Sequence, residues 1–263
     1  MGTALVRLVG LAVVVATVVA LPALGARTLA VDGYSNGTIY PWWSWALVVT
    51  AGSAGAALVV RPSSRVRTWA GAVTLVGGLQ LLGTGIVAVR HWRPAIGIGV
   101  PGDSSNLPDL VRAAAVLAVI GLITAVAGAV LVRAQWGSRG AELPTRVRLA
   151  LVAAAVAFIL VVPLLVVLPH PDLMSWGAAG LMHAGPWAVG LLVAAYSRPP
   201  LARALCMATA ASALFAVVGP NMFAMGLDSR AGWLPALLLA LAAVAVVLFG
   251  LGPGGGGARS SPA

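Results

Sequence analysis

Long runs of apolar residues recur along this chain and constrain its fold more than any other feature. Windows of about 20 apolar residues, enough for a helix to cross about 30 Å of hydrocarbon, occur eight times in the 263 residues. Lipid cannot satisfy the hydrogen bonds of a bare backbone, so runs of this kind must be helical. The sequence therefore predicts an all-α, polytopic integral membrane bundle with about eight transmembrane helices.

Residues 1–252 are expected to form one transmembrane domain, followed by a glycine-rich, disordered cytoplasmic tail over 253–263. The predicted spans are 4–25, 42–60, 68–89, 110–132, 147–168, 175–196, 202–224 and 233–252. The first span also matches a signal peptide, because Arg7 and a short apolar core precede Ala23-Leu24-Gly25, a possible cleavage site. Cleavage would leave seven spans in the same orientation, but the long apolar run favours a retained helix.

The arginines predict the orientation of the bundle. Cytoplasmic loops of membrane proteins carry an excess of basic residues, and this chain has a formal net charge of +10. With the N-terminus in the cytoplasm, the inner segments hold Arg7, Arg61, Arg65, Arg67, Arg133, Arg139, Arg146, Arg148, Arg198, Arg203 and Arg259. The outer segments then hold Arg27, Arg90, Arg93, Arg112 and Arg230. We therefore predict a cytoplasmic N-terminus.

The composition excludes several classes of protein. No hydrophilic domain is available to present a basic face, so nucleic acid is not an expected partner. Connections such as 61–67 and 197–201 are too short for a catalytic domain, and no GxxxxGK[ST] motif occurs. The single Cys206 excludes an internal disulfide. Basic residues that are all arginine, with much alanine, glycine and valine, indicate a GC-rich bacterial genome and hence the cytoplasmic (inner) membrane.

Spans two to four are rich in small residues and contain no interior proline. The third span alone holds Gly77, Gly78, Gly83 and Gly85. Small residues let helix backbones approach closely, so this half of the chain is expected to be a packing scaffold. Gln80 is its main buried polar residue, and we expect a neighbouring helix to satisfy its hydrogen bonds.

Spans five to seven differ, because each carries an interior proline that is expected to kink its helix. These prolines are Pro163, Pro186 and Pro220. The same region contains every methionine except the initiator, and it supplies the candidate metal ligands His170, Met174, Met182, His183, Met222 and Met225. Thioether and imidazole groups suit copper(I), and histidine also serves as an axial ligand to haem. Alternatively, methionines fill the gaps between kinked helices, and a histidine hydrogen-bonds a freed carbonyl.

His183 is the strongest single candidate, because it is the one ionisable group well inside a predicted span. Helical spacing places it on one face with Trp176, Gly180, Trp187 and Gly190. The glycines on this face make room for either an adjoining helix or a flat ligand.

A second candidate cluster, Arg90, His91 and Arg93, lies at the predicted outer surface. It has the chemistry to hold an anion such as a phosphate or lipid headgroup, although arginines at a membrane edge usually meet lipid alone.

The predicted spans hold no carboxylate, which argues against a proton- or cation-coupled transporter and against an intramembrane hydrolase. The leading hypothesis is a non-enzymatic multi-pass membrane protein. It would be the membrane subunit of a larger assembly or a permease-like component for a lipid or apolar solute, with membrane lipids and other membrane subunits as partners. The alternatives are a copper- or haem-handling protein that uses the His/Met cluster and, third, a membrane enzyme acting on a lipid-linked substrate.

Overall fold

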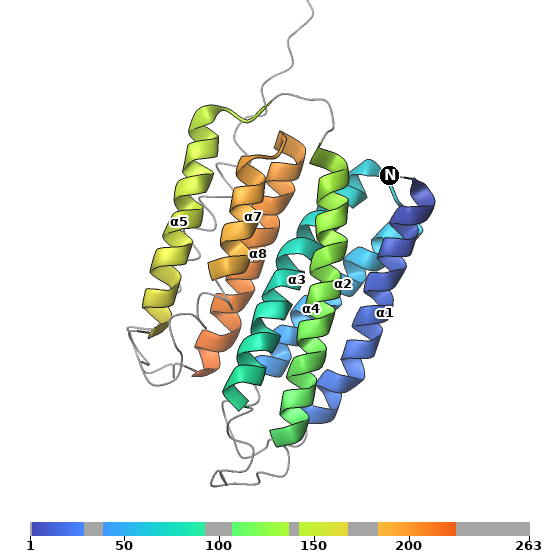
Figure 1. Cartoon of the computed structure of the whole chain (residues 1–263), viewed down its shortest axis with the longest axis vertical. Coiled ribbons are helices and arrows are strands. Elements are labelled where there is room, and N and C mark those ends of the chain that lie inside the picture. The colour runs from blue at the N-terminus through green and yellow to red at the C-terminus, as the bar shows by residue number, and fades with distance from the viewer. Residues whose placement is uncertain (1, 29–38, 93–106, 137–141, 168–183, 225–263) are drawn as a thin grey trace, which may run out of the picture.

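The computed structural model describes residues 2–28, 39–92, 107–136, 142–167 and 184–224, and every element in them is a helix. The helices are α1 (Thr3–Thr28), α2 (Ile39–Val60), α3 (Ser64–Trp92), α4 (Leu107–Trp136), α5 (Thr145–Val167), α7 (Gly185–Ala195) and α8 (Pro199–Ala224). They run side by side in one bundle (Figure 1). The predicted all-α fold class is confirmed for this part of the chain. The predicted span 233–252 and the first part of 175–196 lie outside it.

Three helical segments of the described chain are long and apolar enough to cross a membrane: Thr3–Leu21, Ser64–Arg90 and Val111–Trp136. Large apolar side chains also cover the outside of the bundle. Leu8 on α1 is 61% exposed and Leu160 on α5 is 58% exposed. Apolar exposure on this scale is unfavourable in water and ordinary in lipid. The described helices therefore have the composition of a membrane protein.

Prolines and a serine begin several of the helices. Pro62 and Ser63 separate α2 from α3, and the Ser63 hydroxyl accepts a hydrogen bond from the Val66 backbone N–H at 3.3 Å. Such an N-terminal cap satisfies one of the unpaired donors of the first helical turn. Pro199 and Pro200 open α8, where the missing N–H costs no hydrogen bond.

The helices α5 and α8 continue through Pro163 and Pro220, as the expected interior positions require. Pro186 lies in the first turn of α7 as it is described, directly after Ala184, which also has right-handed helical dihedral angles. Residues 168–183 lie outside the described part of the chain, so the interior position of Pro186 stays a prediction.

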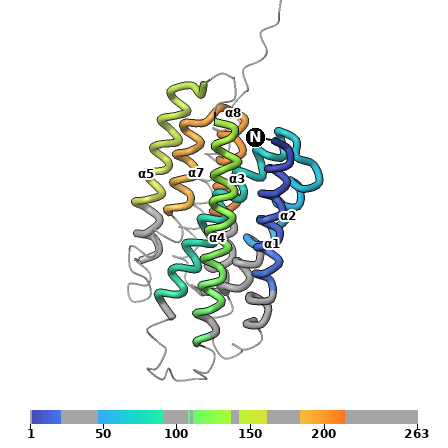
Figure 2. Tube along the Cα trace, turned by 45° about the vertical axis from the view of Figure 1, so that its right-hand side comes forward, coloured from blue at the N-terminus to red at the C-terminus, as the bar shows by residue number. Residues whose placement is uncertain are grey.

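The helix α3 occupies the centre of the bundle. It contacts α2, α4, α7 and α8, while α1 packs against α2 and α4, and α5 packs against α7. Figure 2 shows α5 and α7 on one side, α1 and α2 on the other, and α3, α4 and α8 between them. The whole arrangement is therefore built outward from α3.

Glycines at seven-residue intervals bring α3 and α4 into backbone contact. They are Gly71, Gly78 and Gly85 on α3 and Gly121 and Gly128 on α4. A Cβ added at Gly78 would lie closer than 3.0 Å to the backbone of Ala125, and one at Gly121 equally close to the backbone of Leu82. Backbone atoms cannot move aside as a flexible side chain can. This glycine seam matches the close packing expected from the small residues of these spans.

The helices α1 and α2 form a second close pair. A Cβ added at Gly10 would lie 2.7 Å from the carbonyl oxygen of Gly55, and a Cβ added at Gly55 would lie 2.8 Å from that of Gly10. The two glycines thus allow the same close approach from both sides. The bundle therefore contains two glycine-packed pairs, α1 with α2 and α3 with α4.

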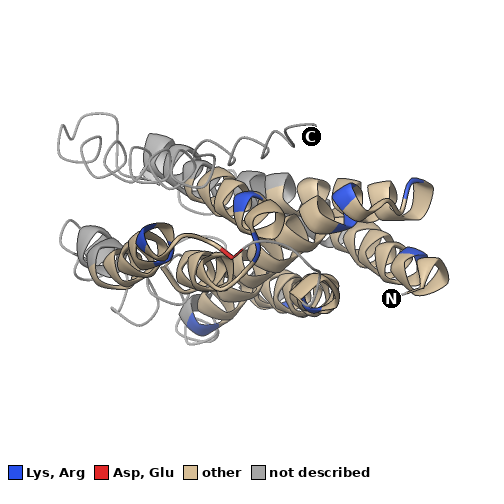
Figure 3. Cartoon of the chain, turned by 90° about the horizontal axis from the view of Figure 1, so that it is seen from above, with Lys and Arg blue, Asp and Glu red and all other residues tan. Residues whose placement is uncertain are grey.

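Most arginines of the described helices belong to segments at one end of the bundle, whereas Arg27, Arg90 and Arg112 belong to the other end. The N-terminus, the α2–α3 connection, the end of α4, the start of α5 and the α7–α8 turn all lie at the first end (Figure 1), and Figure 3 views the bundle from that end with the arginines in blue. The arginines of these segments are Arg7, Arg61, Arg65, Arg67, Arg133, Arg146, Arg148, Arg198 and Arg203. Glu142 pairs with Arg148 at 3.3 Å, and Arg148 also stacks 5.9 Å from the centre of the Tyr196 ring. The described segments thus carry the charge asymmetry from which a cytoplasmic N-terminus is predicted.

Two neighbouring glycines of α3 provide a test of the seam. We expect Gly78→Ala to lower the free energy of unfolding by about 3 kcal/mol, the upper range for overpacking, because the new methyl overlaps the α4 backbone. Gly77→Ala is the matched control, because its nearest neighbour would be Leu47 Cδ2 at 4.0 Å. Unfolding in mixed detergent micelles measures both variants. Equal stability of the two would contradict the seam.

Candidate functional site

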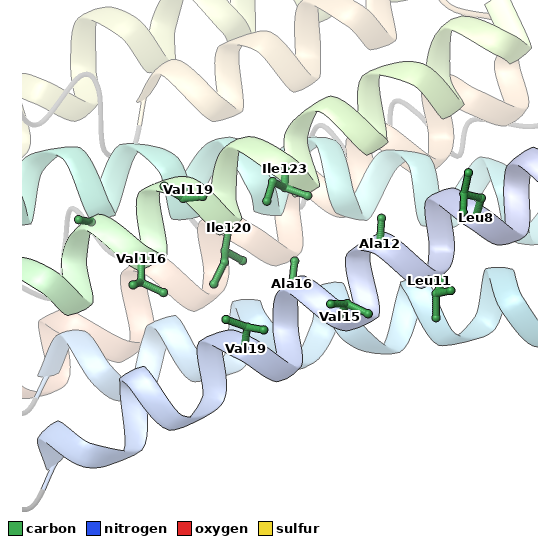
Figure 4. Close-up of a pocket in the computed structure, with 11 residues that line it drawn as sticks. Leu8, Leu11, Ala12, Val15, Ala16, Val19, Val116, Val119, Ile120 and Ile123 are labelled. Atoms are coloured by element: carbon green, nitrogen blue, oxygen red, sulfur yellow. The ribbon is translucent and has the colours of Figure 1, made fainter.

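An apolar groove lies between α1 and α4 on the outside of the bundle (Figure 4). Its volume is about 700 Å³, and every residue that lines it has an aliphatic side chain. The lining consists of Leu8, Leu11, Ala12, Val15, Ala16 and Val19 on α1, with Ala115, Val116, Val119, Ile120 and Ile123 on α4. No lining side chain can donate or accept a hydrogen bond, so the groove suits a hydrocarbon chain and excludes a polar solute.

The groove has a closed bottom and open walls. Ala16 and Ile120 at its bottom are 8% and 3% exposed. Leu8 and Val19 on the α1 wall are 61% and 60% exposed, and Val119 on the α4 wall is 57% exposed. A chain in the groove would thus touch protein below and on both sides and would stay open to its surroundings above.

Side-chain size explains why a groove forms here. Gly10 of α1 faces α2, and Gly121 and Gly128 of α4 face α3, so the glycines that permit close packing point away from the α1–α4 contact. On the groove side, both helices carry branched residues that hold the backbones apart. Small residues at Ala12 and Ala115 then leave the space between them unfilled.

Buried polar side chains elsewhere form a short hydrogen-bonded chain across three helices. The Trp187 indole N–H donates to Ser212 Oγ at 3.3 Å, and the Ser212 hydroxyl donates to Gln80 Oε1 at 2.7 Å. These residues come from α7, α8 and α3, and all three are buried. Phe158 of α5 packs edge-on against the Trp187 ring, with the ring centres 5.4 Å apart. The expectation that a neighbouring helix satisfies Gln80 is confirmed.

This hydrogen-bonded chain holds helices together. Its hydroxyl and indole groups meet each other inside the bundle, where each bond joins two different helices. In apolar surroundings such bonds stabilise helix association by about 1 kcal/mol each. The chain of Gln80, Ser212 and Trp187 is therefore interpreted as packing.

Gly190 lies on the helix face predicted to carry His183, and neighbouring helices fill the space beside it. A Cβ added there would meet the Thr209 hydroxyl of α8, and it would lie 3.0 Å from Val76 Cγ2 of α3. Of the two occupants expected beside this glycine, an adjoining helix or a flat ligand, the structure places a helix there.

Most of the predicted His/Met cluster lies outside the described residues. His170, Met174, Met182, His183 and Met225 belong to undescribed segments, and Met222 is in α8 with its side chain undescribed. Within the described residues, no group of three His, Cys, Asp or Glu side chains lies close enough together to hold a metal. The copper or haem site stays a prediction.

The predicted anion cluster is described only at Arg90. This residue is exposed near the end of α3, at the end of the bundle opposite the N-terminus. The His91 side chain and Arg93 lie outside the described residues, so this anion cluster stays a prediction.

The groove itself was not predicted from the sequence. In hindsight, the signal for it is a pair of small residues, Ala12 and Ala16, one turn apart on a helix that is rich in Leu and Val. Ala and Val are so frequent throughout this chain that such a pair does not stand out. The helix pairing of α1 with α4 is needed to recognise it.

Removal of the Ser212 hydroxyl tests the hydrogen-bonded chain. We expect Ser212→Ala to lower the free energy of unfolding by about 2 kcal/mol, because the variant loses both hydrogen bonds by which this hydroxyl joins α8 to α3 and α7. Ser197→Ala is the control, since that hydroxyl donates to the Val193 carbonyl of its own segment at 2.5 Å. Detergent unfolding measures both. A Ser197→Ala variant as unstable as Ser212→Ala would refute a cross-helix role.

Comparison with known proteins does not identify the groove. No protein-family model matches the chain, and neither a curated protein nor a solved structure matches it.

Proposed function

We propose that this chain is a non-enzymatic multi-pass membrane protein, a permease-like component for a lipid or another apolar solute. In this proposal the groove between α1 and α4 holds a hydrocarbon chain of the solute. The observation that carries it is the lining, which consists of eleven aliphatic residues and no polar one. A groove of this kind has no acid, base or nucleophile with which to change its occupant chemically.

The proposal includes the number of membrane spans, their orientation and the membrane in which they lie. Three described helices with membrane-crossing length, together with the apolar runs of the remaining sequence, support about eight spans. The arginines at the N-terminal end of the bundle support a cytoplasmic N-terminus. The arginine-only basic composition supports the cytoplasmic membrane of a bacterium.

The physics of the groove favours reversible binding. Transfer of a hydrocarbon chain from bulk lipid to an apolar groove gains little from the hydrophobic effect, because lipid tails are already apolar. Retention then depends on van der Waals contact, at about 0.1–0.2 kcal/mol for each pair of atoms. The closed bottom at Ala16 and Ile120 and the two walls of the groove provide such contacts on three sides. Loose, exchangeable binding of this kind is what a permease-like component requires.

Filling the groove tests the proposal. We expect Ala12→Phe and Ala115→Phe to reduce the amount of copurifying lipid or other apolar solute severalfold, because each ring would occupy the space between the helices. Native mass spectrometry of the gently extracted protein measures the bound mass. Ala157→Phe is the matched control, because Ala157 is an exposed alanine of α5 outside the groove lining.

Two results would contradict the proposal. One is a wild-type protein that carries no apolar molecule under conditions that preserve its fold. The other is an equal loss of bound mass in all three variants, which would place the binding elsewhere on the apolar surface.

A further inference from the structure

Arg112 extends the α4 side of the groove toward the end of the bundle. It precedes Val116 by four residues, Val119 by seven and Ile123 by eleven. Residues at these spacings share one face of a helix. Arg112 is exposed, and its position lies on the same face of α4 as the groove lining.

We infer that the occupant of the groove is a phospholipid, with one acyl chain between α1 and α4 and its phosphate bound by Arg112. This inference rests on the proposed function and adds to it the class of ligand. The site and the ligand match in chemistry. The wholly apolar groove suits an acyl chain, and the cationic arginine directly at its end suits an anionic phosphate. A guanidinium binds a phosphate through two parallel hydrogen bonds.

The lengths agree with a lipid in one leaflet. Eleven residues separate Arg112 from Ile123, which corresponds to about 17 Å of helix at 1.5 Å for each residue. One leaflet accounts for half of a hydrocarbon core of about 30 Å. An acyl chain that hangs from a phosphate at Arg112 therefore reaches the far end of the groove within its own leaflet.

Other charged residues near the groove are less well placed. Arg7 precedes Leu8 in the sequence, so it lies about 100° around α1 from that wall residue. Asp109 precedes Arg112 by three residues on α4, and its side chain lies outside the described set. Arg112 also has an interaction partner within the chain. Because a guanidinium offers five donors, a phosphate can be bound beside that partner.

The test compares two lipids with the same acyl chains, a phosphatidylglycerol and a diacylglycerol, which differ by the phosphate headgroup. Each is titrated into the delipidated full-length protein in detergent, and native mass spectrometry gives the bound fraction. We expect the wild type to prefer the phospholipid and Arg112→Gln to lose about tenfold of that preference, the scale of one charge-assisted hydrogen-bonded contact. Arg112→Lys should keep part of it, because the charge remains without the bidentate geometry.

Two further variants test whether the preference depends on Arg112 in particular and whether the lipids bind in the groove. Arg146→Gln removes an exposed arginine at the opposite end of the bundle and should leave the preference unchanged. Ala115→Phe fills the groove and should lower the binding of both lipids.

The outcomes separate the two proposals. Equal binding of both lipids by the wild type would overturn the phosphate contact and leave the groove as a site for apolar chains. An equal effect of Arg112→Gln and Arg146→Gln would overturn it too, since any arginine would then serve. Binding of neither lipid would overturn the proposed function itself.

Discussion

The backbone contact between α3 and α4 is the interaction on which the rest of this bundle depends. It is possible only because glycines recur every seventh residue along both helices, and a Cβ at Gly78, Gly85, Gly121 or Gly128 would lie closer than 3.0 Å to the facing backbone. In lipid, the hydrophobic effect does not drive helices together, so close van der Waals packing must supply the attraction. The seam fixes α3 at the centre, and α2, α7 and α8 then pack on its remaining faces.

The groove forms because no glycine in the described residues brings the backbones of α1 and α4 close together. The two close pairs, α1 with α2 and α3 with α4, each turn their glycines inward toward the partner helix. The α1–α4 contact, which joins the two helix pairs, is made by branched side chains and a few alanines. The backbones therefore stay apart, and the groove of about 700 Å³ remains between them. Arg112 follows on the same helix face. One helix thus offers an apolar wall and a cationic end, the two features of a site for a phospholipid.

Much of this fold follows from the sequence, and the site does not. The apolar runs determine helices because lipid leaves the backbone no other way to pair its polar groups, and Gly77, Gly78 and Gly85 indicate close packing. Which of these glycines faces α4 depends on helix rotation, which the sequence of one helix does not determine. Gln80 was expected to find a partner, but Ser212 lies 132 residues away, and only the packed bundle joins them.

The most direct measurement is photo-crosslinking with a phospholipid that carries a diazirine in its acyl chain, followed by mapping of the modified residues. The account predicts that adducts concentrate on the groove residues of α1 and α4, from Leu8 to Val19 and from Ala115 to Ile123, despite comparable exposure of other apolar faces. An even distribution of adducts over all lipid-facing residues, including Val156 and Leu160 of α5, would contradict it. In that case the groove would be ordinary membrane-exposed surface.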